Sequence, residues 1–450
     1  MNRLGIDRTR VSKEVICYCL NGDHLDQVNP MKIMLTTWGT TGDIRPFLAL
    51  AKSLKISGHQ VQVCASSVYG QQFEEIGVGF RPVGVPLDRD RFDQIMDGII
   101  NIRNPLKSAL VIAKEGILNQ AKQWYNDCLE AMTDCDIAVC HSADMPGQEA
   151  AVKKNLPWMT VSYCPGFIKS SYTAPSPAPN LGKYGNYLLW KIVELMMRYQ
   201  VDPLFNAFFD SIGGNKRNSI GIKGMYSPRL NLVASSCYIA QPPPDLPSYH
   251  RFTGAWFLEE PDYEVPLDLQ EFLDQGPLPI IVSFGSMGGT KGLETTQTIV
   301  DAVQVTGQRA IIQAGWGKLG SQSCGRNGNI LSVGHVPHDF LFRQGICVIH
   351  HGGAGTTHAA CLAGVPSIVI PHLADQPYWG NRLQKLGVAP KILYRKQMTT
   401  KSLASRIFQV INSESMAINA KELGKKIETE DGLGKAVELV EAFGCDFQNN

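Results

Sequence analysis

Short apolar runs alternate with amphipathic segments along the chain from Met31 to about Phe443. Most runs are rich in β-branched residues and end at glycine, proline or small polar residues, which is typical of buried parallel strands. The expected strands are Lys32–Thr37, Gln60–Ala65, Phe80–Val83, Ile137–Cys140, Trp158–Ser162, Leu230–Ala234, Ala310–Gln313, Ile330–Val333, Ile346–Ile349, Ser367–Ile370, Lys391–Leu393 and the run that begins at Ile280. The expected helices are Ile44–Ser57, Leu106–Met132, Gly147–Lys154, Glu294–Thr306, Thr356–Ala363 and further helices to about Phe443. This alternation predicts an α/β protein with doubly wound parallel sheets.

A proline-rich stretch, Glu259–Pro279, interrupts the alternation and has the composition of a linker. The same alternation starts again after it. We therefore expect two Rossmann-like domains, residues 31–260 and 280–450, joined by a linker at residues 261–279. A length of 450 residues suits two such domains.

One strand-turn-helix unit carries three glycines within its turn, His350–Thr357. Glycines let the backbone approach a ligand closely. The helix that follows presents unpaired N–H groups and the positive end of its dipole to the turn. The unit therefore predicts a phosphate site.

A second unit of this kind opens the first domain at Trp38–Asp43. Asp43 is expected at the start of a helix, with Pro46 in the first turn, where a missing N–H does no harm. Aspartate is a preferred helix N-cap, and it can also serve as a general base. Both interpretations of Asp43 stay open on local grounds.

Candidate acceptor contacts lie after an expected strand and in an irregular region. His141 follows a strand, at the edge where doubly wound sheets bind ligands, and is either a ligand contact or a partly buried histidine with satisfied hydrogen bonds. The pattern is lost from Cys164 to Asn186, and long loops in compact domains are usually functional or mobile. The strongly apolar segment Tyr187–Phe209 is a buried core helix, the wall of an acceptor pocket or a patch that docks on a membrane surface. The candidate acceptor residues are His141, Phe167, Tyr172 and Trp190.

The overall composition is ordinary for a globular protein, with 44% hydrophobic residues, 18% charged residues and a net charge of +1. This balance argues against nucleic acid as a partner. Twelve scattered cysteines without CxxC pairs predict reduced thiols in a cytoplasmic protein. No run approaches the roughly 20 apolar residues of a membrane span, and Val15–Leu20 is too short for a signal peptide, so we expect at most a peripheral membrane contact. Residues 1–30 lack periodicity, which predicts a disordered extension.

Neither glycine turn has the GxGxxG pattern of nicotinamide enzymes or the GxxxxGK[ST] pattern of P-loop proteins. Six of the ten histidines lie between His335 and His372. They lack acidic or thiolate partners at metal-ligand spacing, so we expect neither a metal site nor a bound cofactor.

These residues make the chain resemble the inverting nucleotide-sugar glycosyltransferases of GT-B fold, over about residues 31–440. The likeness is strongest to sterol glucosyltransferases and glycopeptide-antibiotic glycosyltransferases. Gly39–Pro46 matches the amino-terminal motif of that family, and the run from Gly334 through His350–Thr357 to Gln376 matches its donor-binding signature. The resemblance implies an acceptor-binding first domain that faces a nucleotide-sugar-binding second domain across a cleft, with the last helix packed back on the first domain.

The resemblance also implies roles for individual residues, with Asp43 as the catalytic base. The implied donor contacts are Ser286, Val336, His350, Gly352, Gly353, Ala354, Gly355, Thr356, Asp375 and Gln376. Among them, His350 and the glycine turn would hold the diphosphate, and the backbone around Val336 would receive the uracil ring. Asp375 and Gln376 would bind the sugar hydroxyls. This chain has His358 where plant relatives have a ribose-binding glutamate, so the ribose contact stays unassigned.

The chemistry of the same residues agrees with this implication. Glycosyl transfer needs a base on the acceptor hydroxyl and stabilisation of the departing diphosphate, which Asp43 and the helix start after His350 can supply without a metal. Asp375 provides a carboxylate for sugar hydroxyls, unless it is only a loop or N-cap residue. We expect an inverting, metal-independent hexosyltransferase that uses UDP-glucose and a lipophilic acceptor such as a sterol. Two alternatives stay open: a polyketide, carotenoid or other natural product as acceptor, and an inactive GT-B protein that binds a nucleotide sugar as an auxiliary.

Overall fold

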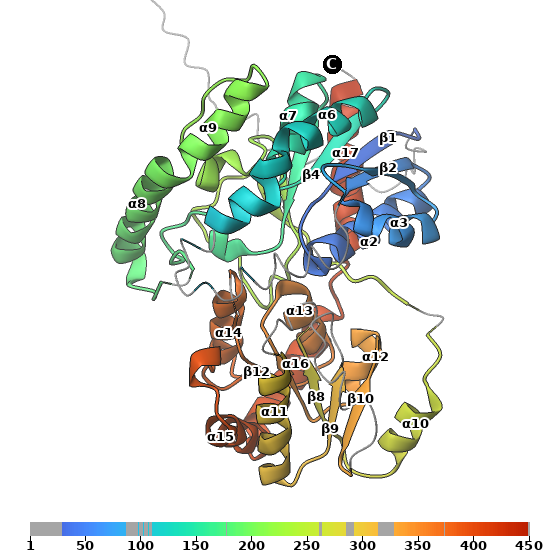
Figure 1. The fold of residues 1–450 in the computed structure, drawn as a ribbon, viewed down its shortest axis with the longest axis vertical. Coiled ribbons are helices and arrows are strands. Elements are labelled where there is room, and N and C mark those ends of the chain that lie inside the picture. The colour runs from blue at the N-terminus through green and yellow to red at the C-terminus, as the bar shows by residue number, and fades with distance from the viewer. Residues whose placement is uncertain are drawn as a thin grey trace, which may run out of the picture.

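The computed structural model describes residues 29–86, 98, 102, 107, 110–176, 178–260, 263–284, 292–313, 328–372 and 374–448. This part of the chain forms two α/β domains, each built on a parallel sheet (Figure 1). The prediction of two doubly wound parallel-sheet domains is confirmed.

The sheet of the first domain has seven strands among the described residues, in the order β3-β2-β1-β4-β5-β6-β7. Neighbouring strands are parallel throughout. The order reverses between β1 and β4, and in such sheets the carboxyl ends of the strands at the reversal form the ligand crevice. The strands are β1 (Lys32–Thr36), β2 (Gln60–Ala65), β3 (Gly79–Pro82), β4 (Ile137–His141), β5 (Trp158–Ser162), β6 (Asn231–Val233) and β7 (His250–Phe252).

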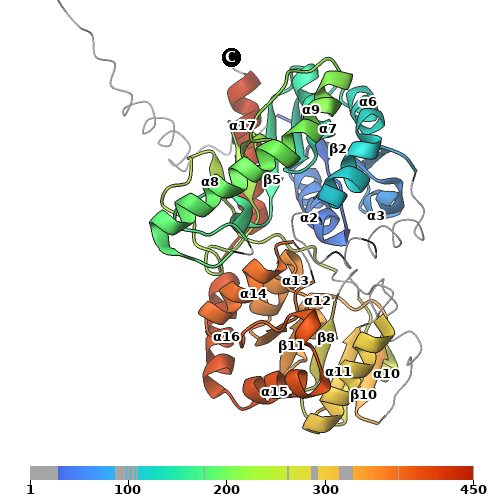
Figure 2. The same ribbon diagram turned by 60° about the vertical axis from the view of Figure 1, so that its left-hand side comes forward.

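Helices cover both faces of this sheet. One face packs against α2 and α3, and the other packs against α6, α7 and α9. The longer helix α8 lies at the outer edge of the domain (Figure 2). The helices are α2 (Thr41–Ile56), α3 (Gly70–Glu75), α6 (Ala121–Ala131), α7 (Met145–Lys153), α8 (Gly182–Gln200) and α9 (Asp202–Ser211), and the short helical turns are η1 (Ser67–Tyr69), η2 (Ile112–Ile117), η3 (Leu118–Gln120), η4 (Pro165–Phe167) and η5 (Ile220–Gly224).

The sheet of the second domain has five parallel strands among the described residues, in the order β10-β9-β8-β11-β12. The strands are β8 (Ile280–Ser283), β9 (Ala310–Gln313), β10 (Ile330–Val333), β11 (Cys347–His350) and β12 (Ser367–Val369). The helical elements are α10 (Leu267–Asp274), α11 (Gly292–Thr306), α12 (His338–Arg343), α13 (Ala354–Leu362), α14 (Gln376–Lys385), η6 (Arg395–Gln397), α15 (Thr400–Ile411), α16 (Glu414–Ile427) and α17 (Gly432–Gln448).

The last helix, α17, lies against the first domain, so the chain crosses back from the second domain between α16 and α17 (Figure 1). Its buried side chains Ala436, Val440 and Phe443 join the core cluster that contains Ile33 of β1 and Ile137 of β4. This apolar contact ties the carboxyl end of the chain to the sheet of the first domain.

The expected helix Leu106–Met132 was wrong as one continuous element. Its described residues are helical but change type: residues 107, 110 and 111 are α-helical, the π-helical turn η2 and the 3₁₀ turn η3 follow, and α6 begins at Ala121. The π turn contains Gly116, which lies against the Trp38 ring where a larger side chain would collide. This close contact lies within the change from α to π geometry, and regular α-helix resumes at Ala121.

Two expectations for the second domain also differ from the structure. The prediction of a strand at Lys391–Leu393 was wrong. Pro390, directly before this segment, has no N–H to donate. Within the segment, only the Leu393 N–H bonds to the edge strand β12, at the Val369 carbonyl. The segment expected as a linker contains α10, whose Leu269 and Phe272 are buried in the core of the second domain.

Candidate active site

Asp43 lies in the first turn of α2, after the carboxyl end of β1. Its Oδ2 accepts hydrogen bonds from the Thr40 N–H at 2.8 Å and from Thr40 Oγ1 at 3.3 Å. Thr40 is therefore the N-cap, Asp43 completes a capping box, and the N-cap interpretation of Asp43 was wrong. Gly39 has a φ of +115°, and a Cβ at this position would collide with the Asp43 carboxylate, so the turn requires glycine.

The Asp43 carboxyl has a raised pKa and remains accessible. Burial raises the pKa to about 6; the Thr40 N–H opposes this rise, and the nearby Asp375 carboxylate adds to it. The side chain keeps 32% of its surface exposed. A carboxylate of this kind can accept a proton near neutral pH.

His141, at the end of β4, faces Asp43, with its Nε2 3.8 Å from Asp43 Oδ1. Its Nδ1 accepts a hydrogen bond from the Ala143 N–H at 3.2 Å, which places the hydrogen of a neutral ring on Nε2. Burial lowers the His141 pKa to about 4, so the ring is neutral at physiological pH. His141 is therefore buried, its Nδ1 is hydrogen-bonded, and its ring lies beside the Asp43 carboxylate. Three aromatic rings surround it, those of Trp38, Phe47 and Tyr163.

Tyr163 fixes the position of Asp43 from the neighbouring strand end. Its hydroxyl donates to the backbone carbonyl of Asp43 at 2.8 Å. Sequence reasoning did not single out Tyr163, although its place directly after β5, at the same sheet edge as His141, was a usable signal.

The glycine turn of the second domain lies between β11 and α13. His350, the last residue of β11, is buried, and its Nδ1 accepts from the Gly352 N–H at 3.1 Å. Burial lowers the His350 pKa to about 3, helped by His351 and His338, so the ring is neutral and carries its hydrogen on Nε2. This Nε2 is buried without a hydrogen-bond partner among the described residues. A buried donor of this kind is suited to an anion that enters the turn.

The helix after the turn adds further donors. Gly353 is the N-cap of α13, which spans Ala354–Leu362, and because glycine has no side chain to accept a hydrogen bond, it leaves the first N–H groups of the helix without a capping partner. Gly355, in the first turn, is exposed, whereas Thr356 is buried. The turn thus combines the His350 Nε2–H with free helix N–H groups, the arrangement that binds phosphate.

Asp375 and Gln376 stand at the start of α14. Asp375 is its N-cap by position, but its side chain makes no capping bond, and Oδ2 instead accepts from the Trp379 indole N–H at 2.8 Å. Burial raises the Asp375 pKa to about 6. Gln376 is buried, and its Oε1 accepts from the His372 N–H at 2.7 Å. The two side chains are therefore held by neighbouring groups before any ligand binds.

The structure brings these two half-sites together across the domain boundary. The Asp375 carboxylate lies close enough to Asp43 to raise its pKa. Beside them, Gly166 of the first domain packs against the Tyr378 ring of α14, where a Cβ would clash with the ring. The candidate base, Asp43, and the candidate sugar-binding residue, Asp375, thus face each other from different domains.

The remaining predicted residues lie in varied places. Val336 is buried, and its carbonyl already accepts from Gln313 Nε2 at 2.6 Å. Ser286 lies outside the described residues. Phe167 and Tyr172 are exposed by 40% and 44%, whereas Trp190 is buried and donates its indole N–H to Thr173 O at 2.8 Å, which fixes the loop before α8.

The comparisons with known proteins match both halves of the chain. A model of the glycosyltransferase family 28 N-terminal domain matches residues 33–153, and one of the erythromycin biosynthesis protein CIII-like C-terminal domain matches residues 318–435. The kitacinnamycin glycotransferase structure has a TM-score of 0.67 at 18% identity and covers 92% of this chain and 99% of its own. The calicheamicin glycosyltransferase structure has a TM-score of 0.67 at 15% identity, with 92% and 98% covered. The chain thus has the GT-B fold, and its first domain matches a glycosyltransferase family model.

Curated relatives of this GT-B glycosyltransferase include sterol 3-beta-glucosyltransferases. That of Aspergillus clavatus is 27% identical over 438 residues, which cover 91% of this chain and 29% of the relative. That of Komagataella phaffii is 27% identical over 432 residues, with 90% and 34% covered. The chain thus spans about a third of the length of the curated relatives that it matches.

His358 connects the two domains of the glycosyltransferase behind the glycine turn. Its Nδ1 is 2.7 Å from the Ala354 carbonyl, to which it donates, and its Nε2 accepts from the Ser236 N–H of the first domain at 3.2 Å. Its ring also meets the Trp379 indole edge-on, with centroids 4.9 Å apart. Both ring nitrogens are engaged, so we assign no ribose contact to His358.

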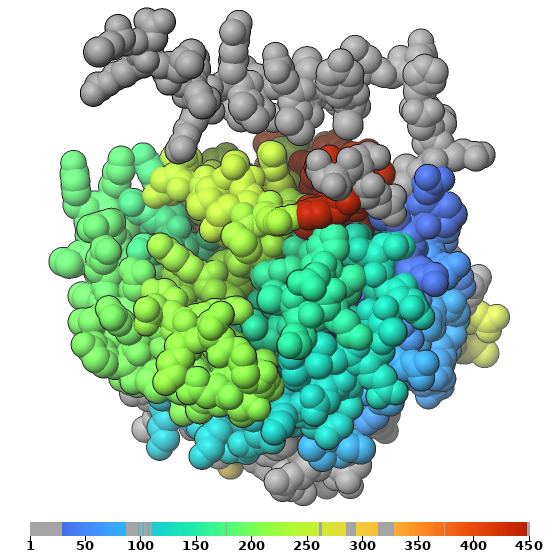
Figure 3. All heavy atoms as spheres, turned by 90° about the horizontal axis from the view of Figure 1, so that it is seen from above, coloured from blue at the N-terminus to red at the C-terminus, as the bar shows by residue number. Residues whose placement is uncertain are grey.

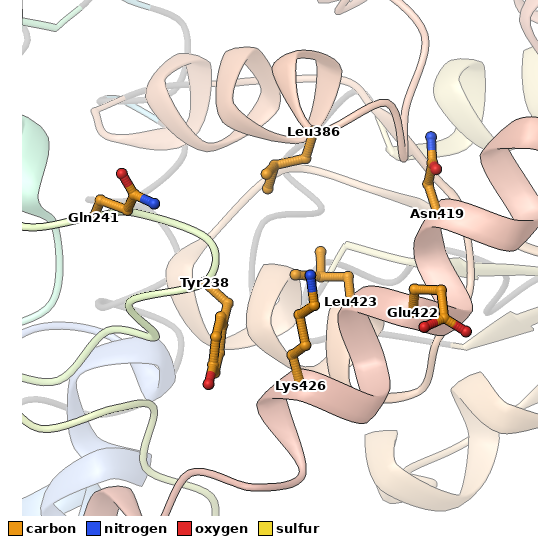
Figure 4. A pocket seen from close by; sticks show the side chains of 7 residues that line it. All are labelled: Tyr238, Gln241, Leu386, Asn419, Glu422, Leu423 and Lys426. Carbon is orange, nitrogen blue, oxygen red and sulfur yellow. The ribbon is translucent and has the colours of Figure 1, made fainter.

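The hollow drawn in Figure 4, of about 320 Å³, lies elsewhere on the domain boundary. It contains none of the predicted site residues. Its lining residues are Tyr238, Gln241, Leu386, Asn419, Glu422, Leu423 and Lys426.

A bridge of three side chains also joins the domains close to Asp43. The Glu260 carboxylate accepts from Arg45 Nη2 at 2.6 Å and lies 3.0 Å from His335 Nε2. The hydrogen bond with His335 and the pairing with Arg45 lower the Glu260 pKa to about 2. Arg45 stands two residues after Asp43, and His335 precedes Val336, so the bridge links the two halves of the site.

The variant Glu260→Gln should lower the Tm of the glycosyltransferase by about 2 °C, because a partly exposed ionic bridge contributes about 1 kcal/mol. Differential scanning calorimetry at neutral pH measures the change. The control is Glu422→Gln, whose carboxylate pairs with Lys425 inside α16, and its Tm should equal that of the wild type. Equal Tm values for both variants would show that the bridge does not hold the domains together.

Proposed function

We propose that this glycosyltransferase moves glucose from UDP-glucose to a hydroxyl of a lipophilic, sterol-like acceptor, with inversion at the anomeric carbon and without a metal. The observation that carries the proposal is the pairing of an accessible Asp43 carboxylate with the buried, unpartnered His350 Nε2–H on the opposite domain. The similarity to sterol 3-beta-glucosyltransferases supports the acceptor class.

The reaction is a single displacement at the anomeric carbon of the donor. The acceptor hydroxyl oxygen attacks this carbon while its proton passes to the Asp43 carboxylate. The bond from carbon to the diphosphate oxygen breaks, and its electron pair leaves with the diphosphate. The His350 Nε2–H and the N–H groups at the start of α13 stabilise the charge that develops there. Attack from the face opposite the leaving group inverts the configuration.

Other residues of the site position the reacting groups. The neutral His141 presents its Nε2–H to Asp43 Oδ1, and Tyr163 holds the backbone of Asp43. The Trp379 indole holds Oδ2 of Asp375 and so turns that carboxylate, which together with Gln376 binds the sugar hydroxyls.

The pH dependence of the reaction follows from Asp43. The carboxylate must be ionised to accept a proton, and its pKa is raised to about 6. The value of kcat/KM should therefore fall about ten-fold for each pH unit below 6 and level off above 7. A profile that stays flat down to pH 5 would contradict the assignment of the base to this carboxyl.

The proposed substrates are tested with purified protein and a panel of apolar alcohols that includes sterols, polyketides and carotenoid alcohols. UDP-glucose and TDP-glucose should be compared, because two structures of similar fold contain thymidine diphosphate. We expect a sterol glucoside from UDP-glucose, at a rate that a chelator does not change. If no acceptor yields a glycoside although UDP-glucose binds, the protein is a nucleotide-sugar-binding auxiliary instead.

A further inference from the structure

Helix α8 carries large apolar side chains on its solvent side. Figures 1 and 2 show the helix at the outer edge of the first domain, and in Figure 3 the same green region forms one flank of the molecule. The inner side of the helix buries Asn186 and Trp190. The large apolar residues with exposed side chains are Tyr184 (89%), Tyr187 (51%), Leu188 (60%), Ile192 (48%), Leu195 (54%), Met196 (39%) and Tyr199 (73%).

Helical geometry gathers most of these side chains into one stripe. At 3.6 residues per turn, Tyr184, Leu188, Leu195 and Tyr199 fall on one face along the whole helix. No helix among the described residues is both long and apolar enough to cross a bilayer. An amphipathic helix with such a stripe instead lies in the plane of a membrane interface.

Positive charge flanks the apolar stripe on one side. Lys191 and Arg198 lie next to it on the helix surface, and Lys183 stands at the first turn. The acidic Glu194 of the helix pairs with Lys169 of the domain at 2.8 Å, and the same oxygen lies 3.9 Å from Lys191 Nζ. The helix therefore presents apolar and cationic groups side by side, which matches an anionic lipid surface. A second copy of the chain would bring the same positive flank.

We propose that the α8 face, defined as the stripe with its three flanking cations, docks on the surface of an anionic lipid bilayer. Aromatic rings and leucines enter the boundary between headgroups and acyl chains, and the cations contact lipid phosphates and carboxylates.

Exposed aromatic rings lie in the chain segment that leads from β5 to α8. Lys183 Nζ lies 5.1 Å from the centroid of the exposed Tyr172 ring, which joins the loop before α8 to the helix. The exposed Phe167 follows Gly166, which packs against Tyr378 in α14, the helix that begins directly after Asp375. Resting on the proposed function, the docking face and Asp43 then belong to the same domain, with the exposed Phe167 and Tyr172 rings in the chain segment that precedes α8.

The test is sedimentation of the full chain with phosphatidylcholine vesicles that contain a minority of phosphatidylserine, and with phosphatidylcholine vesicles alone. The wild type should sediment with the anionic vesicles and be released by salt. The double variant Leu188→Glu/Leu195→Glu should bind at least about ten-fold more weakly. The variants Lys191→Gln and Arg198→Gln should each weaken binding about five-fold.

Two control substitutions place the same charge on other exposed apolar positions, Ile418→Glu in α16 and Leu278→Glu before β8, and should bind like the wild type. Equal vesicle binding by the double variant and the wild type would overturn the proposal. A double variant that changes only the oligomeric state in ultracentrifugation would overturn it too, and would assign the face to a second copy.

A second measurement separates this proposal from the proposed function. The double variant should turn over a bilayer-embedded sterol at least about ten-fold more slowly than the wild type, and a cyclodextrin-dispersed sterol equally fast. Vesicle binding that depends on the α8 face, without any glycosyl transfer, would refute the function and leave the docking surface intact.

Discussion

Replacement of Asp43 by asparagine should lower kcat about a thousand-fold and leave the affinity for UDP-glucose nearly unchanged. The amide oxygen of asparagine can still accept the Thr40 N–H, so the first turn of α2 keeps its capping bond. The amide cannot take the proton of the acceptor hydroxyl, so only the chemical step is lost. Steady-state kinetics give kcat, and calorimetry with UDP-glucose gives the affinity.

The matched control for this variant is Asp136→Asn. The Asp136 carboxylate also accepts a backbone N–H, that of Lys32 at 2.7 Å, but it is exposed and remote from the cleft. Its substitution should leave kcat unchanged. Wild-type kcat in Asp43→Asn would show that another group removes the acceptor proton.

Loss of kcat in Asp43→Asn should not come from unfolding. Burial raises the folded-state pKa of Asp43 from 3.8 to about 6, so the ionised carboxylate opposes folding at neutral pH. This cost appears as the pH rises through the interval between those two values, because the folded state then binds more protons than the unfolded state. Removal of the charge should therefore leave the free energy of unfolding at pH 7 equal to that of the wild type or higher.

The hydrophobic pattern predicted most of the fold because parallel strands are buried on both faces and appear as continuous apolar runs. The strand β7 (His250–Phe252) escaped prediction because two of its three residues are polar. The opposite error arose at Lys391–Leu393, where Ile392 and Leu393 are buried by packing without joining the sheet. An apolar run reports burial, and hydrogen-bond partners decide whether a buried run becomes a strand.

The local parts of the site could also be predicted, because glycine turns and helix starts consist of consecutive residues. Contacts between residues far apart in the sequence could not be predicted. Tyr163 is 120 positions from Asp43, and Ser236 is 122 positions from His358, so no spacing in the sequence connects either pair. Glu260 lay in a stretch that composition marked as a linker, and only the fold reveals its contacts with both domains.

The variant His350→Asn should weaken UDP binding about ten- to hundred-fold, because it removes one buried donor to the diphosphate. The asparagine Oδ1 takes the place of the histidine Nδ1, so it can still accept the Gly352 N–H and keep the glycine turn in shape. What disappears is the Nε2–H, which is buried and without a partner among the described residues. Titration calorimetry with UDP measures this loss directly and needs no acceptor.

The control for His350→Asn is the same change at His250, a buried histidine of β7 whose pKa is likewise lowered by burial, to about 4. Its Nδ1 contacts Asn231 at 3.0 Å, far from the glycine turn in the topology of the first sheet, so UDP affinity should stay at the wild-type value. Unchanged affinity in both variants would mean that the helix N–H groups hold the diphosphate alone. In that case the backbone N–H groups of α13 alone bind the diphosphate, and the unpartnered Nε2–H of His350 bonds a different group of the nucleotide-sugar donor.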